Sequence, residues 1–283
     1  MTYAIEVNNF NKVYDGFELK DVCFKLETGT IMGIVGENGA GKSTIIKGIL
    51  NLINIDSGDI KIFGKDFKEN ASEIKKDISV VFDESYFHDN LKLPDIDKIM
   101  KNIYPNWDKN KFLKYTNHFK LPNNKRVKDF SRGMKMKLSI AVALSHNAKL
   151  LILDEATSGL DPVVRDEILD IFLDYIQNED CSILIASHIT SDLEKVADYI
   201  TFVNNGKIIF SENKDELIYN SGVVKCSEKD IDKISKEDIV GIRKNTFGCE
   251  VMVSDRAKYE NIGFVIDKTN LEEIILFKVR GQK

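Results

Sequence analysis

A short apolar segment followed by a glycine-rich loop constrains the fold of this chain more than any other feature. Residues 31–35, Ile-Met-Gly-Ile-Val, form a continuous apolar run, as expected of a strand buried on both faces of a sheet. The next residues read Gly36-Glu37-Asn38-Gly39-Ala40-Gly41-Lys42-Ser43-Thr44, and residues 43–52 have the pattern of a helix. This order of strand, loop and helix is the context in which G-x-x-x-x-G-K-S/T cradles the phosphates of a nucleotide.

The residue types in this loop suit phosphate binding. Gly36, Gly39 and Gly41 allow the backbone to turn its N–H groups toward phosphate oxygens, and the helix that follows adds the positive end of its dipole. Lys42 would reach the β- and γ-phosphates, and the Ser43 hydroxyl would bind Mg²⁺. The alternative is a glycine turn with an incidental Lys-Ser pair, and the strand and helix on either side favour the nucleotide site.

Two carboxylates follow a second buried strand. Residues 150–153 are apolar, and Asp154 and Glu155 come directly after them. Ligands of open parallel sheets bind at the carboxyl ends of strands, so these side chains are expected to face the phosphates. We predict that Asp154 holds Mg²⁺ through water and that Glu155 is the general base that orients and deprotonates the attacking water. A solvated pair of carboxylates in a turn is the alternative, which the phosphate loop disfavours.

The alternation of strands and helices predicts an α/β fold with a mostly parallel sheet. Residues 3–35 are β-rich, and residues 19–26 alternate apolar with polar, which indicates an N-terminal antiparallel β subdomain. Residues from about 84 to 147 read as an inserted block of helices, and Asn204-Asn205-Gly206 is a strong hairpin signal. The sequence pattern changes near residue 217. From there on, short strand-like segments and a final helix around 271–277 indicate a small α+β unit. We therefore expect a P-loop ATPase core in residues 1–216 and an accessory domain in residues 217–283.

Composition excludes several other classes of protein. The chain has 40 Lys and Arg against 45 Asp and Glu, a net charge of −5, so we expect no nucleic-acid partner that relies on general basic charge. The four cysteines have no C-x-x-C spacing, which favours a reducing cytosol over a disulfide framework or a zinc site. We expect no signal peptide and no membrane-spanning helix, because the apolar runs are only as long as strands.

The motifs, in their order along residues 1–215, resemble those of the nucleotide-binding ATPase subunit of ABC transporters. Phe130-Ser131-Arg132-Gly133-Met134-Lys135 is similar to the signature motif, Ser158-Gly159-Leu160-Asp161 matches the D-loop, and His188 matches the switch histidine. The signature variant, the Tyr104–Asp108 stretch (YPNWD) and the short C-terminal domain look most like the bacterial YtrB/bacitracin-export branch.

The resemblance implies roles for residues outside the phosphate loop. Ser131 and Gly133 would bind the γ-phosphate of ATP held by a second ATPase subunit, so that two subunits pair head to tail around two ATP molecules. His188 would contact the γ-phosphate, and Tyr14 would stack on adenine. A plain helix N-cap at Ser131 and a structural histidine are the alternatives, and Phe10 and Phe17 compete with Tyr14. His88, His118 and His146 are expected to be structural.

Three residues depart from the family pattern. Asp83 stands where a glutamine is usual, and it would still ligate Mg²⁺ while adding negative charge near the phosphates. Arg132 replaces a glycine of the signature and adds a cation that would favour the partner's ATP. Ala156 replaces a proline, which changes the stiffness of the loop rather than its chemistry.

The resemblance predicts an ATP-binding subunit that hydrolyses ATP with Mg²⁺ to drive a separate integral membrane transporter subunit. Its expected place is the cytoplasm, peripheral at the inner face of the cell membrane, with the helical block of residues 84–147 as the docking surface. Two alternatives stay open at this point. One is a soluble ABC ATPase, for example in iron–sulfur assembly, and the other is a nucleotide-gated interaction module that hydrolyses ATP weakly.

Overall fold

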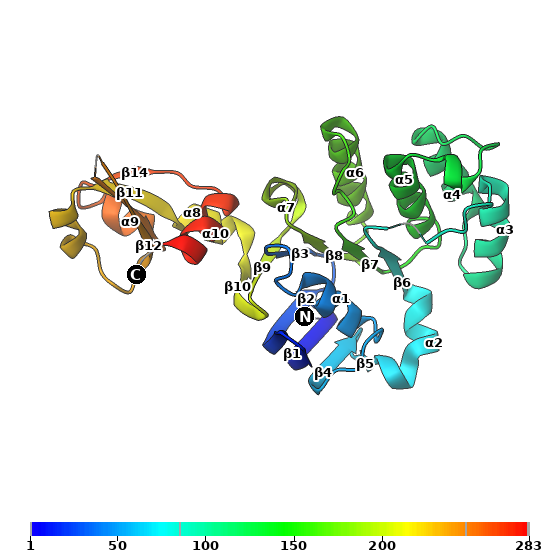
Figure 1. Ribbon diagram of the computed structural model, residues 1–283, viewed down its shortest axis with the longest axis horizontal. Helices are drawn as coiled ribbons and strands as arrows, with labels where there is room; N and C mark the ends of the chain where they lie inside the picture. Colours follow the sequence, from blue (N-terminus) through cyan, green and yellow to red (C-terminus); the bar gives the residue numbers. More distant parts are fainter. Residues whose placement is uncertain (1, 85, 247, 282–283) are drawn as a thin grey trace.

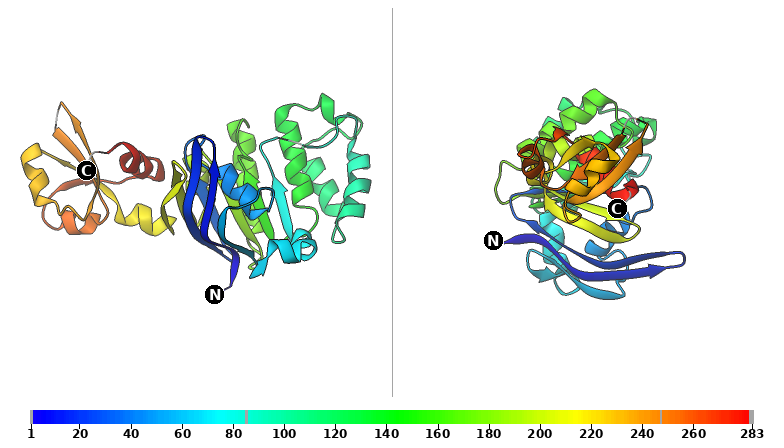
Figure 2. Two further views of the ribbon diagram at one scale, coloured as in Figure 1. Left: turned by 60° about the horizontal axis from the view of Figure 1, so that its bottom comes forward. Right: turned by 90° about the vertical axis from the view of Figure 1, so that its left-hand side faces the viewer.

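Three sheets run along the molecule, with helices between and beside them (Figure 1). The computed structural model describes residues 2–84, 86–246 and 248–281. None of the helices among these residues has the length and apolar character needed to cross a bilayer. The helical insertion and the C-terminal sheet lie at opposite ends of the molecule (Figure 2).

The central sheet has six strands in the order β10-β9-β3-β8-β7-β6. All neighbouring pairs are parallel except β9 and β10, which form the predicted hairpin. The predicted mostly parallel α/β sheet is therefore confirmed. Its strands are β3 (Ile31–Val35), β6 (Ile78–Val81), β7 (Leu150–Asp154), β8 (Ser182–Ser187), β9 (Tyr199–Asn204) and β10 (Lys207–Asn213).

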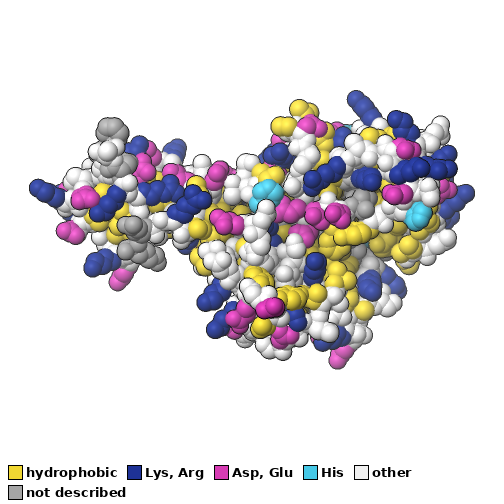
Figure 3. All heavy atoms as spheres, in the orientation of Figure 1, with side chains coloured by type: hydrophobic (Ala, Val, Ile, Leu, Met, Phe, Trp, Pro, Cys, Tyr) yellow, Lys and Arg dark blue, Asp and Glu magenta, His cyan; other side chains and the backbone are white. Residues whose placement is uncertain are grey.

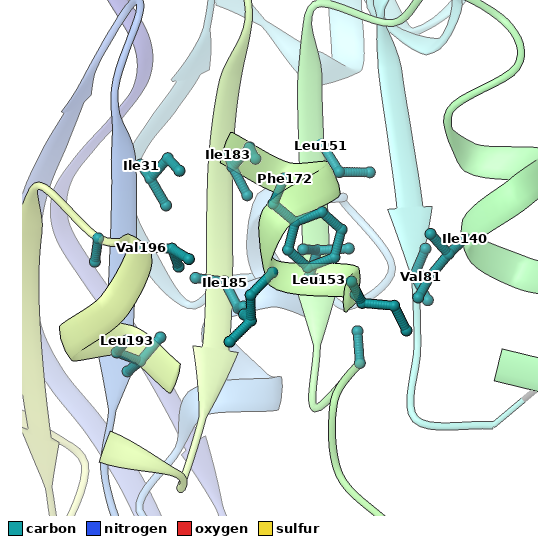
Figure 4. Close-up of a cluster of buried hydrophobic side chains, with 14 of the residues drawn as sticks. Ile31, Val81, Ile140, Leu151, Leu153, Phe172, Ile183, Ile185, Leu193 and Val196 are labelled. Carbon is teal, nitrogen blue, oxygen red and sulfur yellow. The ribbon is translucent and has the colours of Figure 1, made fainter. Parts of the chain in front are cut away.

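Both faces of this sheet are covered, which explains why its inner strands are continuously apolar. Alternate residues enter two different cores: Ile31 and Val35 of β3 point to one side, and Met32 and Ile34 to the other. On the first side they meet α5 (Arg132–Ala143), α6 (Pro162–Tyr175) and α7 (Thr190–Val196) (Figure 4). On the second side they meet α1 (Lys42–Ile49) and the N-terminal sheet.

The N-terminal sheet is antiparallel, as predicted, in the order β2-β1-β4-β5. Its strands are β1 (Tyr3–Tyr14), β2 (Phe17–Glu27), β4 (Ser57–Ile62) and β5 (Lys65–Asp66). It continues into α2 (Phe67–Asp77), a helix that the sequence pattern did not predict. Asp66 caps α2 by accepting hydrogen bonds from the N–H groups of Lys68 and Glu69, and few apolar residues mark its buried side.

The predicted helical block lies between β6 and β7. It contains α3 (Leu93–Ile103), α4 (Lys109–His118), a single 3₁₀ turn at Val127–Asp129 and α5. The helical periodicity of the sequence predicts starts at Pro94, Lys109 and Arg132, and the three α-helices begin within one residue of these positions. His146 supports the end of this block, since its Nε2 lies 3.0 Å from the carbonyl of Ile78 and its ring stacks on Tyr104. It therefore has the structural role that was expected of it.

The C-terminal sheet has the order β12-β13-β11-β14 and is antiparallel. Its strands are β11 (Gly222–Cys226), β12 (Ile239–Asn245), β13 (Gly248–Val253) and β14 (Val265–Asp267). Around it lie α8 (Lys214–Asn220), a 3₁₀ segment at Glu228–Lys233, α9 (Arg256–Glu260) and α10 (Leu271–Arg280). The predicted boundary between residues 216 and 217 falls inside α8.

The C-terminal unit shares a core with the central sheet. Leu271, Ile274 and Phe277 of α10 are fully buried and belong to the same cluster as Leu193 and Val196 of α7. At the start of α10, the Leu271 N–H donates to Glu194 Oε2 of α7 at 3.1 Å. We call this contact between α10 and α7 the seam. It joins the C-terminal unit to the helix that covers β3.

Replacing Phe277 with alanine should destabilise the whole chain, because a fully buried phenylalanine leaves a cavity that costs about 3–5 kcal/mol. Trp107, the one tryptophan of the sequence, lies in the helical insertion and can report unfolding there by its fluorescence. We expect the urea midpoint of the Trp107 transition to fall in Phe277→Ala and to stay unchanged in Val265→Ala, whose side chain is exposed. An unchanged midpoint in Phe277→Ala would show that the seam does not couple the two parts.

Candidate active site

The parallel strands end in register at one edge of the central sheet. Val35 of β3 pairs with Ser187 of β8, and Ala186 pairs with Asp154 of β7. The phosphate loop, Glu155 and His188 are the next residues along these three strands. They are therefore brought together by the pairing of the strands, as the rule for the carboxyl edge of open sheets predicts. Acidic side chains gather near the middle of the face drawn in Figure 3.

Close packing shapes the phosphate loop. A Cβ on Gly36 would lie 2.4 Å from the carbonyl oxygen of Val203, so only glycine fits there. Gly41 has a φ of 116° and stands at the start of α1 without a side-chain cap. The loop is also tied to the β9–β10 turn, because Gly206 N–H donates to the carbonyl of Ala40 at 3.0 Å. Glu37, Asn38 and Gly39 are exposed at its tip.

Lys42 is buried beneath this loop. Its Nζ donates to the carbonyl of Gly36 at 2.8 Å and to that of Glu37 at 3.3 Å. It also lies 3.2 Å from Glu155 Oε1. The lysine thus joins the phosphate loop to the carboxylate that follows β7.

Ser43 and Asp154 form the candidate magnesium site. The Ser43 hydroxyl donates to Asp154 Oδ1 at 3.1 Å, and Asp154 is 4% exposed. Burial raises the pKa of Asp154; the hydrogen bond from Ser43 opposes the rise, and the charges of Glu155 and Asp83 add to it. A buried carboxylate beside a hydroxyl, in excess negative charge, offers the oxygen donors and the field that suit Mg²⁺. These residues fit the ion.

Glu155 lies between a lysine and a histidine. Its Oε1 faces Lys42, and its Oε2 lies 2.7 Å from Nδ1 of His188. The backbone of Glu155 has a φ of 54°, in the left-handed region, and its N–H donates to the carbonyl of Ala186. This turn directs the side chain across the ends of β7 and β8. Oε1 is buried and has no hydrogen bond of good geometry with any residue that the structure describes, so it retains capacity to accept one.

Tyr14 and Phe17 lie at the β1–β2 turn beside the phosphate loop. They are paired across the hairpin, and the Phe17 ring approaches Gly41. Tyr14 is 42% exposed, and Lys12 Nζ lies 5.3 Å from the centre of its ring. Phe10 is fully buried against Gly48, so it belongs to the core and no longer competes with Tyr14.

The signature residues lie at the start of α5. Ser131 is exposed and caps the helix by accepting from the N–H of Met134 at 3.2 Å, so the N-cap alternative is present as well. No hydrogen bond between the described residues joins Ser131 or Gly133 to the phosphate loop of the same chain. Arg132 packs on the D-loop, since a Cβ on Gly159 would lie 3.2 Å from its guanidinium carbon.

Asp83 lies between the magnesium site and the signature. Its charge contributes to the raised pKa of Asp154. It also lines a cavity of about 480 Å³ together with Arg132 and Lys135. Asp83 and Arg132, the two charged residues that depart from the family pattern, therefore border one cavity. The sequence alone did not predict this.

Two charged residues behind the site were not predicted. Asp192 of α7 is buried, and Arg165 of α6 lies beside it. The sequence feature that could have indicated Asp192 is its place among the apolar residues of a short helix, beside Leu193 and Val196.

A phosphate loop at the end of a central strand, with a buried aspartate and a glutamate at the next strand ends, defines a P-loop ATPase. The sequence matches the family described as ABC transporter over residues 19–158. It is 32% identical to the ABC transporter ATP-binding protein YtrB of Bacillus subtilis (strain 168), over 75% of this chain and 73% of that protein. It is 36% identical to the lantibiotic transport ATP-binding protein SrtF of Streptococcus pyogenes, over 76% and 96%.

Other relatives and solved structures agree. Identity to the bacitracin transport ATP-binding protein BcrA of Enterococcus faecalis is 33%, over 77% of this chain and 71% of that protein. A solved ATP-binding subunit of an ABC transporter superposes with a TM-score of 0.67 at 25% identity, over 76% of this chain and 92% of that one. The chain belongs to the ATP-binding proteins of ABC transporters. Its activity is ATP binding and hydrolysis in support of transport, which decides against the two alternatives left open by the sequence.

Asp154→Asn should stabilise the nucleotide-free protein at neutral pH, because it removes a buried charge and keeps an acceptor for Ser43. The folded-state pKa of Asp154 is raised, so its carboxylate costs stability as the pH rises through that value. The stability advantage of Asp154→Asn should therefore shrink as the pH falls. Thermal unfolding at several pH values measures this, with the exposed Asp232→Asn as control. Equal stability of Asp154→Asn and the parent at neutral pH would contradict it.

Proposed function

We propose that Glu155 is the general base of ATP hydrolysis in this chain. One observation carries this proposal: Glu155 is held between Lys42 of the phosphate loop and His188 of the next strand end, at 3.2 and 2.7 Å. A carboxylate in this place can accept a proton from water next to the γ-phosphate. General-base catalysis of this kind supplies about 10²–10⁴ in rate.

The remaining proposed roles follow from the same arrangement. Residues 36–44 would bind the phosphates of ATP through main-chain N–H groups, with Lys42 at the β- and γ-phosphates. His188 uses Nδ1 to contact Glu155, and its side chain is 43% exposed, so its other nitrogen can face the γ-phosphate. Tyr14 would offer its ring to adenine.

Mg²⁺ would be held by Ser43 and Asp154, with Asp83 as a further ligand from the neighbouring loop. When bound, the ion neutralises charge on the β- and γ-phosphate oxygens. The buried hydrogen bond from Ser43 to Asp154 keeps both donors oriented.

We further propose that two ATPase subunits pair head to tail, identical or not. Ser131 and Gly133 would bind the γ-phosphate of the partner's ATP, and the exposed start of α5 supports this. A dimer of an ATP-binding cassette with ADP and Pi, 20% identical, has the same fold with a TM-score of 0.67.

The proposed partner is an integral membrane transporter subunit, which would dock on the helical insertion of residues 84–147. The chain would then work in the cytoplasm, peripheral at the inner face of the membrane. Three relatives are named as a transporter ATP-binding protein, a lantibiotic transport protein and a bacitracin transport protein. Residues 1–216 would form the ATPase domain, and residues 217–283 the accessory domain.

Glu155→Gln should bind ATP and turn it over about 10²–10⁴ times more slowly, because the amide cannot take the proton. The variant should accumulate as an ATP-bound dimer in gel filtration. Glu167→Gln is the matched control, since it removes another glutamate paired with a histidine, His118, at 3.0 Å. Parental turnover in Glu155→Gln would remove Glu155 from the role of base.

Lys42→Ala should weaken ATP binding, because it removes the buried ammonium that would neutralise charge on the β- and γ-phosphates. Calorimetric titration measures the affinity, and the exposed Lys47→Ala on the same helix is the control. An ATP affinity equal to that of the parent would count against the phosphate loop as the binding site.

A further inference from the structure

The helix that follows the switch histidine carries a charge on its buried side. α7 begins two residues after His188, and the Asp192 side chain is 4% exposed. Its neighbour Leu193 packs beneath Gly33 of β3, whose Cβ would lie 3.1 Å from the leucine methyl groups. Burying a carboxylate is costly unless it is paired and hydrogen-bonded, so the partners of Asp192 need an explanation.

These partners come from the segment that follows Glu155. Arg165 of α6 places Nη1 3.8 Å from Asp192 Oδ1, and its Nη2 donates to the carbonyl of Leu160 at 3.4 Å. Thr157 lies beside the carboxylate. Burial raises the pKa of Asp192, and the hydroxyl of Thr157, with the positive charge of Arg165, offsets part of the rise. Asp192 thus touches the first residue of the segment 157–160 and, through Arg165, the last.

The cluster is not built for stability alone. Three of its atoms are buried and form no hydrogen bond of good geometry within the described part of the chain: Asp192 Oδ2, Thr157 Oγ1 and Arg165 Nε. A buried ion pair with incomplete hydrogen bonding adds little to stability, and apolar residues of similar volume often do as well or better. The pair of Asp192 and Arg165 links the segment that follows Glu155 to the helix that follows His188, and this link suggests a role in the active site.

We propose that Asp192 is a positioning residue for ATP hydrolysis, which ties α7, and with it His188, to the segment 157–160 that follows Glu155. The histidine and the glutamate sit on neighbouring strand ends, and their 2.7 Å contact depends on the relative placement of these two segments. Arg165 and Asp192 fix that placement from behind. This inference rests on the proposed roles of Glu155 and His188.

Asp192→Asn should lower kcat by about 10- to 100-fold, because a small displacement of catalytic groups has effects of that size. The KM for ATP should change by less than about twofold, since the phosphate loop is untouched. Asp170→Asn is the matched control: Asp170 pairs with Lys195 at 2.7 Å across the same two helices, but at the surface. Parental kcat in Asp192→Asn, or an equal loss in Asp170→Asn, overturns the proposal.

A double-mutant cycle separates positioning from general damage. If Asp192 acts through His188, Asp192→Asn should cause little further loss of kcat in a His188→Ala background. An undiminished effect in that background overturns the proposal.

A second pair of substitutions guards against misfolding. Asp192→Leu combined with Arg165→Met replaces the ion pair with apolar side chains and should keep the parental melting temperature. It should still lose kcat as Asp192→Asn does, and parental kcat in a folded double variant overturns the proposal. The Glu155→Gln experiment is independent of these variants. Parental kcat in the Asp192 variants would leave Glu155 as the general base, whereas parental turnover in Glu155→Gln would remove that assignment.

Discussion

The register of the central parallel sheet is the constraint on which the rest of the structure depends. Because Val35 pairs with Ser187 and Asp154 with Ala186, three chain segments leave the sheet at one edge. Each segment contributes one functional element: the phosphate loop, the carboxylates and the switch histidine. A shift of one residue in β3, β7 or β8 would separate Glu155 from Lys42 or His188, and the apolar side chains on both faces of the sheet oppose such a shift.

The same edge concentrates charge in a buried place, which has an energetic cost. Asp154, Glu155, Lys42 and Asp192 are all largely removed from water, and the pKa values of Asp154 and Asp192 are raised by burial. The core elsewhere is apolar and well covered, and it stabilises the fold enough to keep these groups in place. This division between an apolar core and a costly polar edge is typical of active sites.

Much of this arrangement was predictable from the sequence. Continuous apolar runs predicted the buried strands β3 and β7, and the glycine spacing predicted the phosphate loop. Asn204-Asn205-Gly206 predicted the β9–β10 hairpin. These signals are local: each depends on a few adjacent residues and on backbone preferences that context rarely overrides.

The rest depends on tertiary packing that local patterns do not encode. α7 has seven residues and no side-chain cap, so nothing marks its start. The contact of α10 with α7, and that of Asp192 with Arg165, join residues distant in the sequence. The shared cavity of Asp83 and Arg132 was hidden for the same reason, although both residues stood out as departures from the family pattern.

The central claim is that residues 36–44 bind a triphosphate whose terminal phosphate faces Glu155. A structure of this chain with Mg²⁺ and a non-hydrolysable ATP analogue tests it most directly. The account predicts phosphates on the main-chain N–H groups of the loop, Mg²⁺ at Ser43 and Asp154, and Ser131 of a second subunit at the γ-phosphate. A nucleotide bound elsewhere, with the loop and these side chains free of phosphate, would contradict the account.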